Sequence, residues 1–319
     1  MIKRQSIITF LRKFSAWHEL TLFILILAIF AIAAGLMPKF LSLKGQLILS
    51  RQLWEMALLA IPMTFIIITG GIDLSIGSTM GLSATSFGLT FAATGNIYLA
   101  SVASTITGTL CGAMNGLFIA SFKLHPLIVT LATYALFRGL AEGLSKGESF
   151  SGFGDGFSQL ARGSIWGIPL VGFFFVTSLA LGVIFLTKTI PGRTLYHIGR
   201  NRMGVIYSGT NVKKLETLLY AFSGTMAGIV AVIFISRFNT AKADAGFNIE
   251  LDVITAVVVG GTSIFGGKGN LAGTTLGLIL IHETKLFTSR YFQTDELKII
   301  IVGVLLITSV LIQRKAHKS

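Results

Sequence analysis

The chain has 319 residues, of which 53% are hydrophobic and only 12% are charged, and its formal net charge is +13. Soluble domains carry about 25% charged residues, so this composition excludes a soluble enzyme, an ATPase or a soluble binding lobe. The basic residues stand at the ends of apolar runs rather than in one patch, which excludes nucleic acid as a partner and reports membrane topology instead.

Apolar runs of about 20 residues recur along the chain, and about 20 helical residues cross the hydrocarbon core of a bilayer. The runs lack the period-two alternation of a membrane β-barrel. We therefore predict an all-α, polytopic membrane helical bundle of about ten transmembrane helices, forming one domain over residues 1–319. The predicted spans are 20–37, 48–70, 74–94, 97–121, 126–145, 166–187, 215–235, 251–265, 270–289 and 296–312.

Charges between the spans predict the orientation of the chain. Six basic residues gather in the loop 188–214, and cytoplasmic loops carry an excess of Lys and Arg. This loop and both termini are therefore predicted to be cytoplasmic. Its semi-apolar segment 203–207 predicts a short helix that needs a partner, with a solvated loop as the alternative. Residues 145–165 are predicted to form an external loop, with a short interfacial helix.

The second predicted span ends in a polar, glycine-rich break, TGGIDLSIGS at residues 69–78. Non-helical backbone at membrane depth persists only where it is buried in protein or lines a cavity. Asp73 is therefore either a pathway residue or the N-cap of the third span, and the two roles are compatible.

Glycines four residues apart mark the fourth and ninth predicted spans. That spacing puts small residues on one helix face and lets two membrane helices approach closely. The helix-packing glycines are Gly108, Gly112 and Gly116, and then Gly269, Gly273 and Gly277. Because the two faces lie an odd number of spans apart, corresponding helices would run in opposite directions, which indicates an inverted repeat. Asn115 either contacts a solute or hydrogen-bonds a neighbouring helix.

The segment 246–277 combines an acidic entry, an apolar run, a glycine cluster at 260–269 and a second apolar run. We predict two transmembrane helices joined by a tight glycine turn. We predict that the acidic entry of this segment faces the outside of the cell and that the glycine turn faces the cytoplasm.

No pattern for catalysis or metal binding emerges. His282 and Glu283 lack the second histidine of a zincin site, because Leu286 stands in its place. Gly267 and Lys268 do not form a P-loop, because Gly269 occupies the Ser/Thr position. The single Cys111 excludes an intramolecular disulfide and a cysteine-clustered metal site. We therefore expect no enzyme activity, no metal and no cofactor on this chain.

Five ordered motifs carry a resemblance to a known family: TGGIDLSIGS at 69–78, GAMNG at 112–116, PLIVTL at 126–131, GRN with YSG at 199–209, and GGTS with GGKG at 260–269. Over residues 55–310 the chain resembles the permease subunits of bacterial ABC importers for ribose, xylose, arabinose, rhamnose and autoinducer-2. PMT at 62–64 and SRF at 236–238 look most similar to the autoinducer-2 permeases, with the rhamnose permeases next.

The resemblance implies an inner-membrane permease domain that translocates a small sugar or sugar-like solute by alternating access. Implied partners are an ATP-binding cassette subunit that binds the ATP, a second permease chain in a homo- or heterodimer, and a periplasmic or lipid-anchored solute-binding protein. The candidate pathway residues are Asp73, Asn115, Thr262 and Ser263, with Asn248, Glu250 and Asp252 at the outer mouth. The implied coupling loop includes Gly199, Asn201, Tyr207, Ser208 and Gly209.

Departures from the family pattern at Ala132 and at residues 203–205 leave the solute open. We expect a charge at Val205 to block docking of the ATPase without unfolding the chain. The alternative function is an ion-coupled secondary transporter, which would need a buried titratable residue within a span. Glu55, His282 and Glu283 are the candidates.

Overall fold

The computed structural model describes residues 2–37, 40–294 and 296–318, which form twelve helices and four two-residue strands. The helices are α1 (Ile2–Leu36), α2 (Leu43–Ile68), α3 (Ile76–Thr94), α4 (Ile97–Phe122), α5 (Pro126–Ser145), α6 (Asp155–Arg162), α7 (Leu170–Lys188), α8 (Ile190–Tyr207), α9 (Val212–Phe238), α10 (Ile249–Val259), α11 (Leu271–Phe292) and α12 (Glu296–Lys318). The strands are β1 (Phe150–Ser151), β2 (Ser164–Ile165), β3 (Ile168–Pro169) and β4 (Thr240–Ala241).

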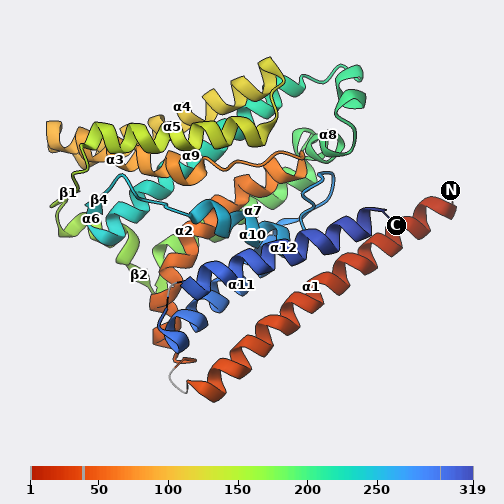
Figure 1. The fold of residues 1–319 in the computed structure, drawn as a ribbon, viewed down its shortest axis with the longest axis horizontal. Helices are drawn as coiled ribbons and strands as arrows, with labels where there is room; N and C mark the ends of the chain where they lie inside the picture. Colours follow the sequence, from red (N-terminus) through yellow and green to blue (C-terminus); the bar gives the residue numbers. More distant parts are fainter. Residues whose placement is uncertain (1, 38–39, 295, 319) are drawn as a thin grey trace.

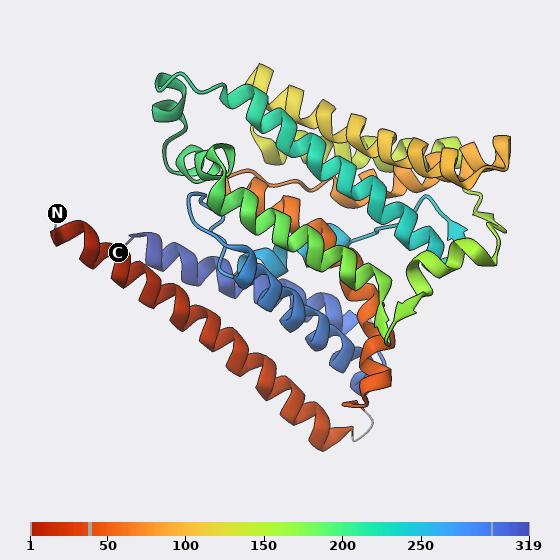
Figure 2. The same cartoon turned by 180° about the vertical axis from the view of Figure 1, so that it is seen from behind.

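The helices form an elongated bundle with α2 at its centre (Figure 1). On one side of α2 lie α3, α4, α5 and α9, and on the other lie α1, α10, α11 and α12. Both ends of the chain lie at the same end of the molecule, which Figure 2 shows from behind. The prediction of an all-helical membrane bundle is confirmed. Among the described residues, six helices are long and apolar enough to cross a membrane, namely α1, α2, α4, α5, α7 and α9.

Glycine packing joins α4 to α9. A Cβ atom on Gly108 would lie 2.2 Å from the carbonyl oxygen of Gly224, and one on Gly112 would lie 2.1 Å from that of Tyr220. One on Gly116 would lie 2.6 Å from Cα of Thr217. The glycines predicted to pack from α4 therefore lie directly against the backbone of α9, where no larger residue fits.

Helix α10 differs from its predicted span. It has 11 residues and ends at Val259, because Gly260 caps it and Gly261 turns the chain with φ +94°. At 1.5 Å per residue, such a helix is about 17 Å long, roughly half of what a bilayer requires. The prediction of a full helical span over 251–265 is therefore wrong, although the tight glycine turn that follows α10 is present.

The ninth span also begins later than predicted. Helix α11 starts at Leu271, where the side chain of Asn270 accepts a hydrogen bond from the amide of Gly273 (2.5 Å). Gly269 lies before the helix, facing Thr262 and Ile68, so placing it on the helix face was wrong. Gly273 and Gly277 do lie on that face, and they pack against α10 rather than α9.

The two loop segments that the sequence predicted to contain short helices do contain them. Helix α6 lies between β1 and β2 and packs against α9, where the amide of Ala161 donates to Ser236 Oγ (3.1 Å). Helix α8 occupies most of the loop 188–214 and is longer than expected. It bends at Asn201, whose φ and ψ are −157° and 89°.

Candidate functional site

Asp73 stands in the segment between α2 and α3, at the centre of a buried polar cluster. Its Oδ1 accepts from the amide (3.0 Å) and the hydroxyl (2.7 Å) of Ser75, and its Oδ2 accepts from Ser223 Oγ on α9 (2.9 Å). Asn115 on α4 donates to Ser75 Oγ (2.7 Å). The residue before α3 is Ser75, so the N-cap role predicted for Asp73 is wrong. Instead, Asp73 ties the start of α3 to α9 and, through Ser75, to α4.

We expect Asn115→Ala to reduce stability and to leave transport by the folded protein intact. The substitution removes one buried hydrogen bond and should cost about 1–2 kcal/mol of unfolding free energy. Thermal unfolding in detergent, together with uptake normalised to folded protein, measures the two effects. Loss of uptake with unchanged stability would instead identify Asn115 as a solute contact.

Three backbone segments meet at a second feature, which we call the glycine junction: residues 68–70 after α2, Gly199 and Arg200 of α8, and residues 266–269 before α11. The amide of Gly267 donates to the carbonyl of Ile68 (2.8 Å). A Cβ atom on Gly199 would lie 2.1 Å from that carbonyl oxygen and 2.3 Å from the Gly267 nitrogen. Only glycine at 199 permits this contact, so α8 rests directly on the turn between α10 and α11.

Side chains reinforce the glycine junction. Tyr196 Oη donates to the carbonyl of Gly269 (3.0 Å), and Arg200 Nε donates to that of Gly267 (3.3 Å). Thr262 is buried in this turn, and the amide of Ser263 donates to Lys268 (3.0 Å). These two predicted pathway residues therefore belong to the turn that contacts α8.

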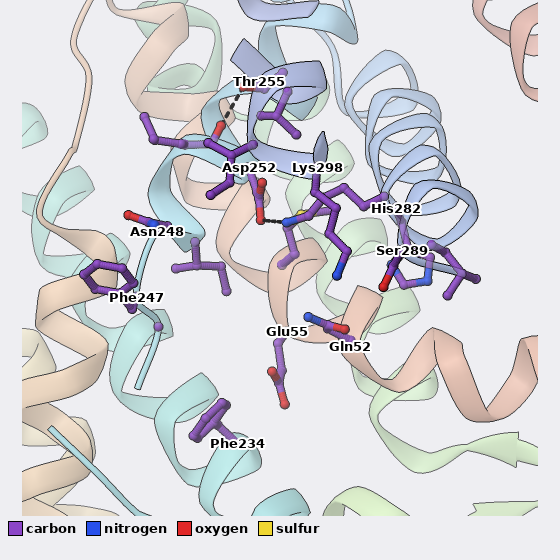
Figure 3. A pocket seen from close by; sticks show the side chains of 18 of the residues that line it. Gln52, Glu55, Phe234, Phe247, Asn248, Asp252, Thr255, His282, Ser289 and Lys298 are labelled. Carbon is purple, nitrogen blue, oxygen red and sulfur yellow. Dashed lines mark hydrogen bonds and ion pairs between the residues drawn. The ribbon is translucent and has the colours of Figure 1, made fainter. Parts of the chain in front are cut away.

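A cavity of about 1020 Å³ lies between α2, α9, α10, α11 and α12 (Figure 3). Of the predicted pathway residues, Asn248 and Asp252 line it. Glu250 does not. Its carboxylate is buried at the start of α3, where a Cβ atom on Gly77 would lie 2.2 Å from Glu250 Oε2.

Two ion pairs stand in the cavity wall. Arg237 on α9 donates to both carboxylate oxygens of Glu55 on α2 (2.8 and 2.9 Å), and its guanidinium lies 4.2 Å from the ring centre of Phe238. Lys285 on α11 pairs with Asp252 on α10. Each pair joins two helices across the cavity. The charges within each pair cancel, so these four residues add no net charge to the wall.

The comparison with protein families decides what kind of chain this is. The family described as "Branched-chain amino acid transport system / permease component" matches residues 47–310. The chain belongs to this permease family. It is therefore the non-catalytic transmembrane subunit of an ABC importer, a multi-pass membrane protein that carries no cofactor of its own. This membership removes the need for the ion-coupled alternative.

Two relatives cover most of the permease. It is 35% identical to the ribose import permease protein RbsC of Bacillus subtilis (strain 168), over 93% of this chain and 91% of the relative. It is 33% identical to the autoinducer 2 import system permease protein LsrD of Escherichia coli (strain K12), over 83% of this chain and 82% of the relative. No solved structure matches the chain.

The segment predicted to form the coupling loop presents a different surface from the one expected. Val205 is only 8% exposed and packs with Ile198, Val212 and Leu215, so a charge there would disrupt α8 and α9 rather than a docking surface. The expectation for Val205 is therefore corrected. Tyr207, at the end of α8, is 83% exposed and points away from the bundle core.

The other predicted coupling residues shape this segment. Asn201 accepts from the amide of Gly204 (3.0 Å) at the bend, Ser208 Oγ donates to Val205 (2.7 Å), and Gly209 turns the chain with φ +83°. Arg202 is bound to both oxygens of Glu216 on α9 (2.8 Å each). These hydrogen bonds raise the pKa of Arg202, so the link between α8 and α9 keeps its charge.

Sequence reasoning missed Arg237, Lys285 and Gln52 as cavity residues. For Arg237 and Lys285, the signal available was a charged residue within an apolar run, which is expensive in a membrane and marks a functional position. That signal does not identify the ion-pair partner of a charged residue, because Glu55 and Arg237 are 182 positions apart in the sequence.

Proposed function

We propose that this permease carries a small sugar or sugar-like solute, such as ribose, rhamnose or autoinducer-2, across the bacterial inner membrane. ATP hydrolysis on a separate ATP-binding subunit drives the transport. A periplasmic or lipid-anchored solute-binding protein delivers the solute, and a second permease chain, identical or different, completes the channel. The two relatives, a ribose and an autoinducer 2 import permease, support this class of solute.

The proposed topology has cytoplasmic termini, a cytoplasmic α8 and ten crossings. In the eighth crossing, a series of turns over residues 242–248 precedes the short helix α10. Its support is that α1, α8, α12 and the 260–269 turn meet at one end of the molecule: His18 Nε2 lies 3.0 Å from the Val259 carbonyl, and Gln313 donates to Val258 (3.1 Å). The basic loop at this end favours the cytoplasmic side.

An inverted repeat is part of this proposal. The motif Gly-Thr-x-x-Gly occurs at residues 108–112 of α4 and again at 273–277 of α11. In α4, Thr109 Oγ1 lies 2.8 Å from Thr225 Oγ1 of α9, and in α11, Thr274 Oγ1 lies 3.0 Å from Thr64 Oγ1 of α2. One threonine pair thus joins the fourth span (α4) to the seventh (α9), and the other joins the ninth (α11) to the second (α2). The fourth and ninth spans are five apart, and so are the seventh and second, as expected for a repeat with a five-span offset.

The observation that carries the proposed mechanism is the contact of Gly199 with Ile68 and Gly267. A coupling helix that moves with the ATPase would displace the glycine turn and with it α10, whose first residues line the cavity. Asp73 and Glu250 remain candidate pathway residues, and they would face a solute only if α3 and α10 separate, whereas Asn115 is assigned to the hydrogen bond with Ser75.

Uptake into vesicles tests the function. The permease, reconstituted with its ATP-binding subunit and binding protein, is expected to accumulate the solute with ATP and to fail with a non-hydrolysable nucleotide. Collapse of the proton gradient should leave uptake unchanged. Uptake that needs the gradient and no nucleotide would contradict the proposal.

We expect Tyr207→Ala to weaken binding of the ATP-binding subunit by about 30-fold, because a large exposed aromatic at a docking surface contributes about 2 kcal/mol or more. Co-purification and titration of the two subunits measure the effect. Tyr98→Ala is the matched control, since Tyr98 is 84% exposed at the opposite end of the molecule. Equal binding by the Tyr207→Ala and wild-type permeases would refute the docking assignment.

A further inference from the structure

In the proposed mechanism the glycine turn (residues 260–269) passes movement from α8 to α10, although its backbone has unusual freedom. It contains five glycines, and Gly261, Gly266 and Gly267 have φ between +74° and +94°. Glycine has more conformational freedom than any other residue. A push from α8 at Gly267 would therefore be absorbed within the turn unless other contacts hold its shape.

The carboxamide of Gln313 on α12 bonds to this turn with both of its ends. Its Nε2 donates to the carbonyls of Val258 (3.1 Å) and Thr262 (3.2 Å), and its Oε1 accepts from the amide of Ile264 (3.2 Å). Val258 belongs to the last turn of α10, where helical carbonyls lack partners within the helix. One side chain thus ties the end of α10 to the middle of the glycine turn.

Two neighbouring residues of α1 hold both ends of the same turn. His18 Nε2 donates to the carbonyl of Val259 (3.0 Å), the last residue of α10, and a Cβ atom on Gly261 would lie 2.8 Å from His18 Cδ2. Glu19 Oε1 accepts from Nδ2 of Asn270 (3.0 Å), the N-cap of α11. A donor at the end of one helix and a carboxylate at the start of another both complement the partial charges of helix ends. Helix α1 therefore joins α10 to α11.

Helix α8 contacts a different part of the turn. Gly199 and Arg200 meet it at residues 266–267, whereas α1 and α12 bond to residues 258–264 and to Asn270. Both terminal helices pass the turn at the end of the molecule where the chain begins and ends (Figure 2). Held in this way, the end of α10, the glycine turn and the start of α11 move as one unit when α8 displaces any part of it.

We propose that Gln313, His18 and Glu19 are positioning residues for transport, which keep the glycine turn rigid so that its displacement by α8 reaches α10. The inference rests on the proposed function and assigns the two terminal helices a part in coupling. None of the three side chains lines the large cavity, so their effect on uptake passes through the turn.

Gln313→Met tests the role of α12, because it keeps the length of the side chain and removes its three hydrogen bonds. The assay uses vesicles that hold the permease with its ATP-binding subunit and binding protein, and whichever of ribose, rhamnose and autoinducer-2 the wild type transports. Solute taken up per ATP hydrolysed should fall about threefold to tenfold, the factor that corresponds to losing one to two net hydrogen bonds. Binding of the ATP-binding subunit should stay unchanged.

Gln46→Met is the matched control. Gln46 is also half-buried and donates to a backbone carbonyl, that of Phe40 (2.9 Å), but it lies at the start of α2, away from the turn. Its substitution should leave uptake per ATP at the wild-type value. An equal fall in both glutamine variants would overturn the assignment of Gln313.

Hydrogen exchange of the permease alone measures the rigidity of the turn directly. In Gln313→Met the amide of Ile264 loses its acceptor, so exchange of peptides that cover residues 260–270 should rise about tenfold, while α4 and α9 keep their wild-type exchange. Unchanged exchange over 260–270 would overturn the inference. A rise throughout the chain would do so as well, because it would show a general loss of stability.

Conservative variants of α1 separate hydrogen bonding from the filling of space. His18→Gln keeps an N–H donor and Glu19→Gln keeps an acceptor, so uptake per ATP should stay within about twofold of the wild type. His18→Leu and Glu19→Leu remove these groups and should lower it about threefold to tenfold. Equal losses in the glutamine and leucine variants would show that only the volume of the side chains matters, and would overturn the role given to α1.

The outcomes separate this inference from the proposed function. ATP-driven uptake by the wild type, together with normal uptake per ATP in Gln313→Met, His18→Leu and Glu19→Leu, would overturn the positioning role and leave the function standing. Failure of the wild type to take up any of the three probes with ATP would count against the proposed function, and the coupling role would fall with it.

Discussion

Gly199→Ala is expected to reduce solute uptake by at least about tenfold while the ATP-binding subunit still binds. The added methyl group would lie 2.1 Å from the carbonyl oxygen of Ile68 and 2.3 Å from the nitrogen of Gly267. Both neighbours are backbone atoms, so neither can rotate away, and the hydrogen bond between them must lengthen. The docking surface at Tyr207 lies eight residues further along α8 and stays intact. Helix α8 would then move without displacing α10.

The measurement pairs uptake with ATP hydrolysis and subunit binding in the same vesicles. Gly139→Ala is the matched control, because among the described residues the added methyl group would meet no atom within 4 Å apart from the adjoining backbone of its own helix. That substitution should be neutral or stabilising by up to about 1 kcal/mol. Normal uptake by the Gly199→Ala permease would show that the glycine junction does not transmit the coupling motion.

The second large effect is on stability, at Glu55. Glu55→Ala removes the carboxylate that holds Arg237 and should lower the free energy of unfolding by about 3 kcal/mol, because the cation is left largely buried. We place the loss at the lower end of the usual range since the Arg237 side chain keeps 18% of its surface exposed. Two rigid walls of the cavity, α2 and α9, would lose their direct link.

The matched control is Glu216→Ala. It breaks a bidentate pair of the same kind, with Arg202, whose side chain is 36% exposed and can return to water. Exposed pairs contribute about 1 kcal/mol or less. Detergent-based unfolding of the two variants measures the difference. Equal losses would mean that burial of Arg237 does not determine the strength of the Glu55 pair.

The glycine pattern shows what residue spacing alone can predict about helix packing. Four-residue intervals predicted small helix faces on α4 and α11, and the structure places glycines on both. The partner of each face did not follow from the pattern, since Gly108 meets α9 and Gly273 meets α10. Spacing also assigned Gly269 to α11, because a periodic series does not reveal that Asn270 caps the helix and starts it one residue later.

The cavity shows which residues local sequence patterns can predict and which they cannot. Asn248 and Asp252 were predicted from a local acidic entry, and they line it. Gln52, Arg237 and Lys285 lie on other helices, far away in sequence, and the charges of Arg237 and Lys285 within apolar runs did not reveal which residues they would face. Glu250, two residues from both Asn248 and Asp252, turns instead toward α3, because successive helical residues point in different directions.

The sequence by itself determined that this chain is a helical membrane protein and a permease, since apolar runs of bilayer length and five ordered motifs are properties of local composition and order. It also determined where glycine turns break the helices, because those turns need conformations that other residues rarely adopt. Only the tertiary structure decided that α8 rests on the turn beyond α10, that Val205 is internal, and that Asn248 belongs to the same cavity as Gln52 and His282. Those contacts join segments separated by dozens to hundreds of residues, and their formation depends on how whole helices pack rather than on any stretch of sequence.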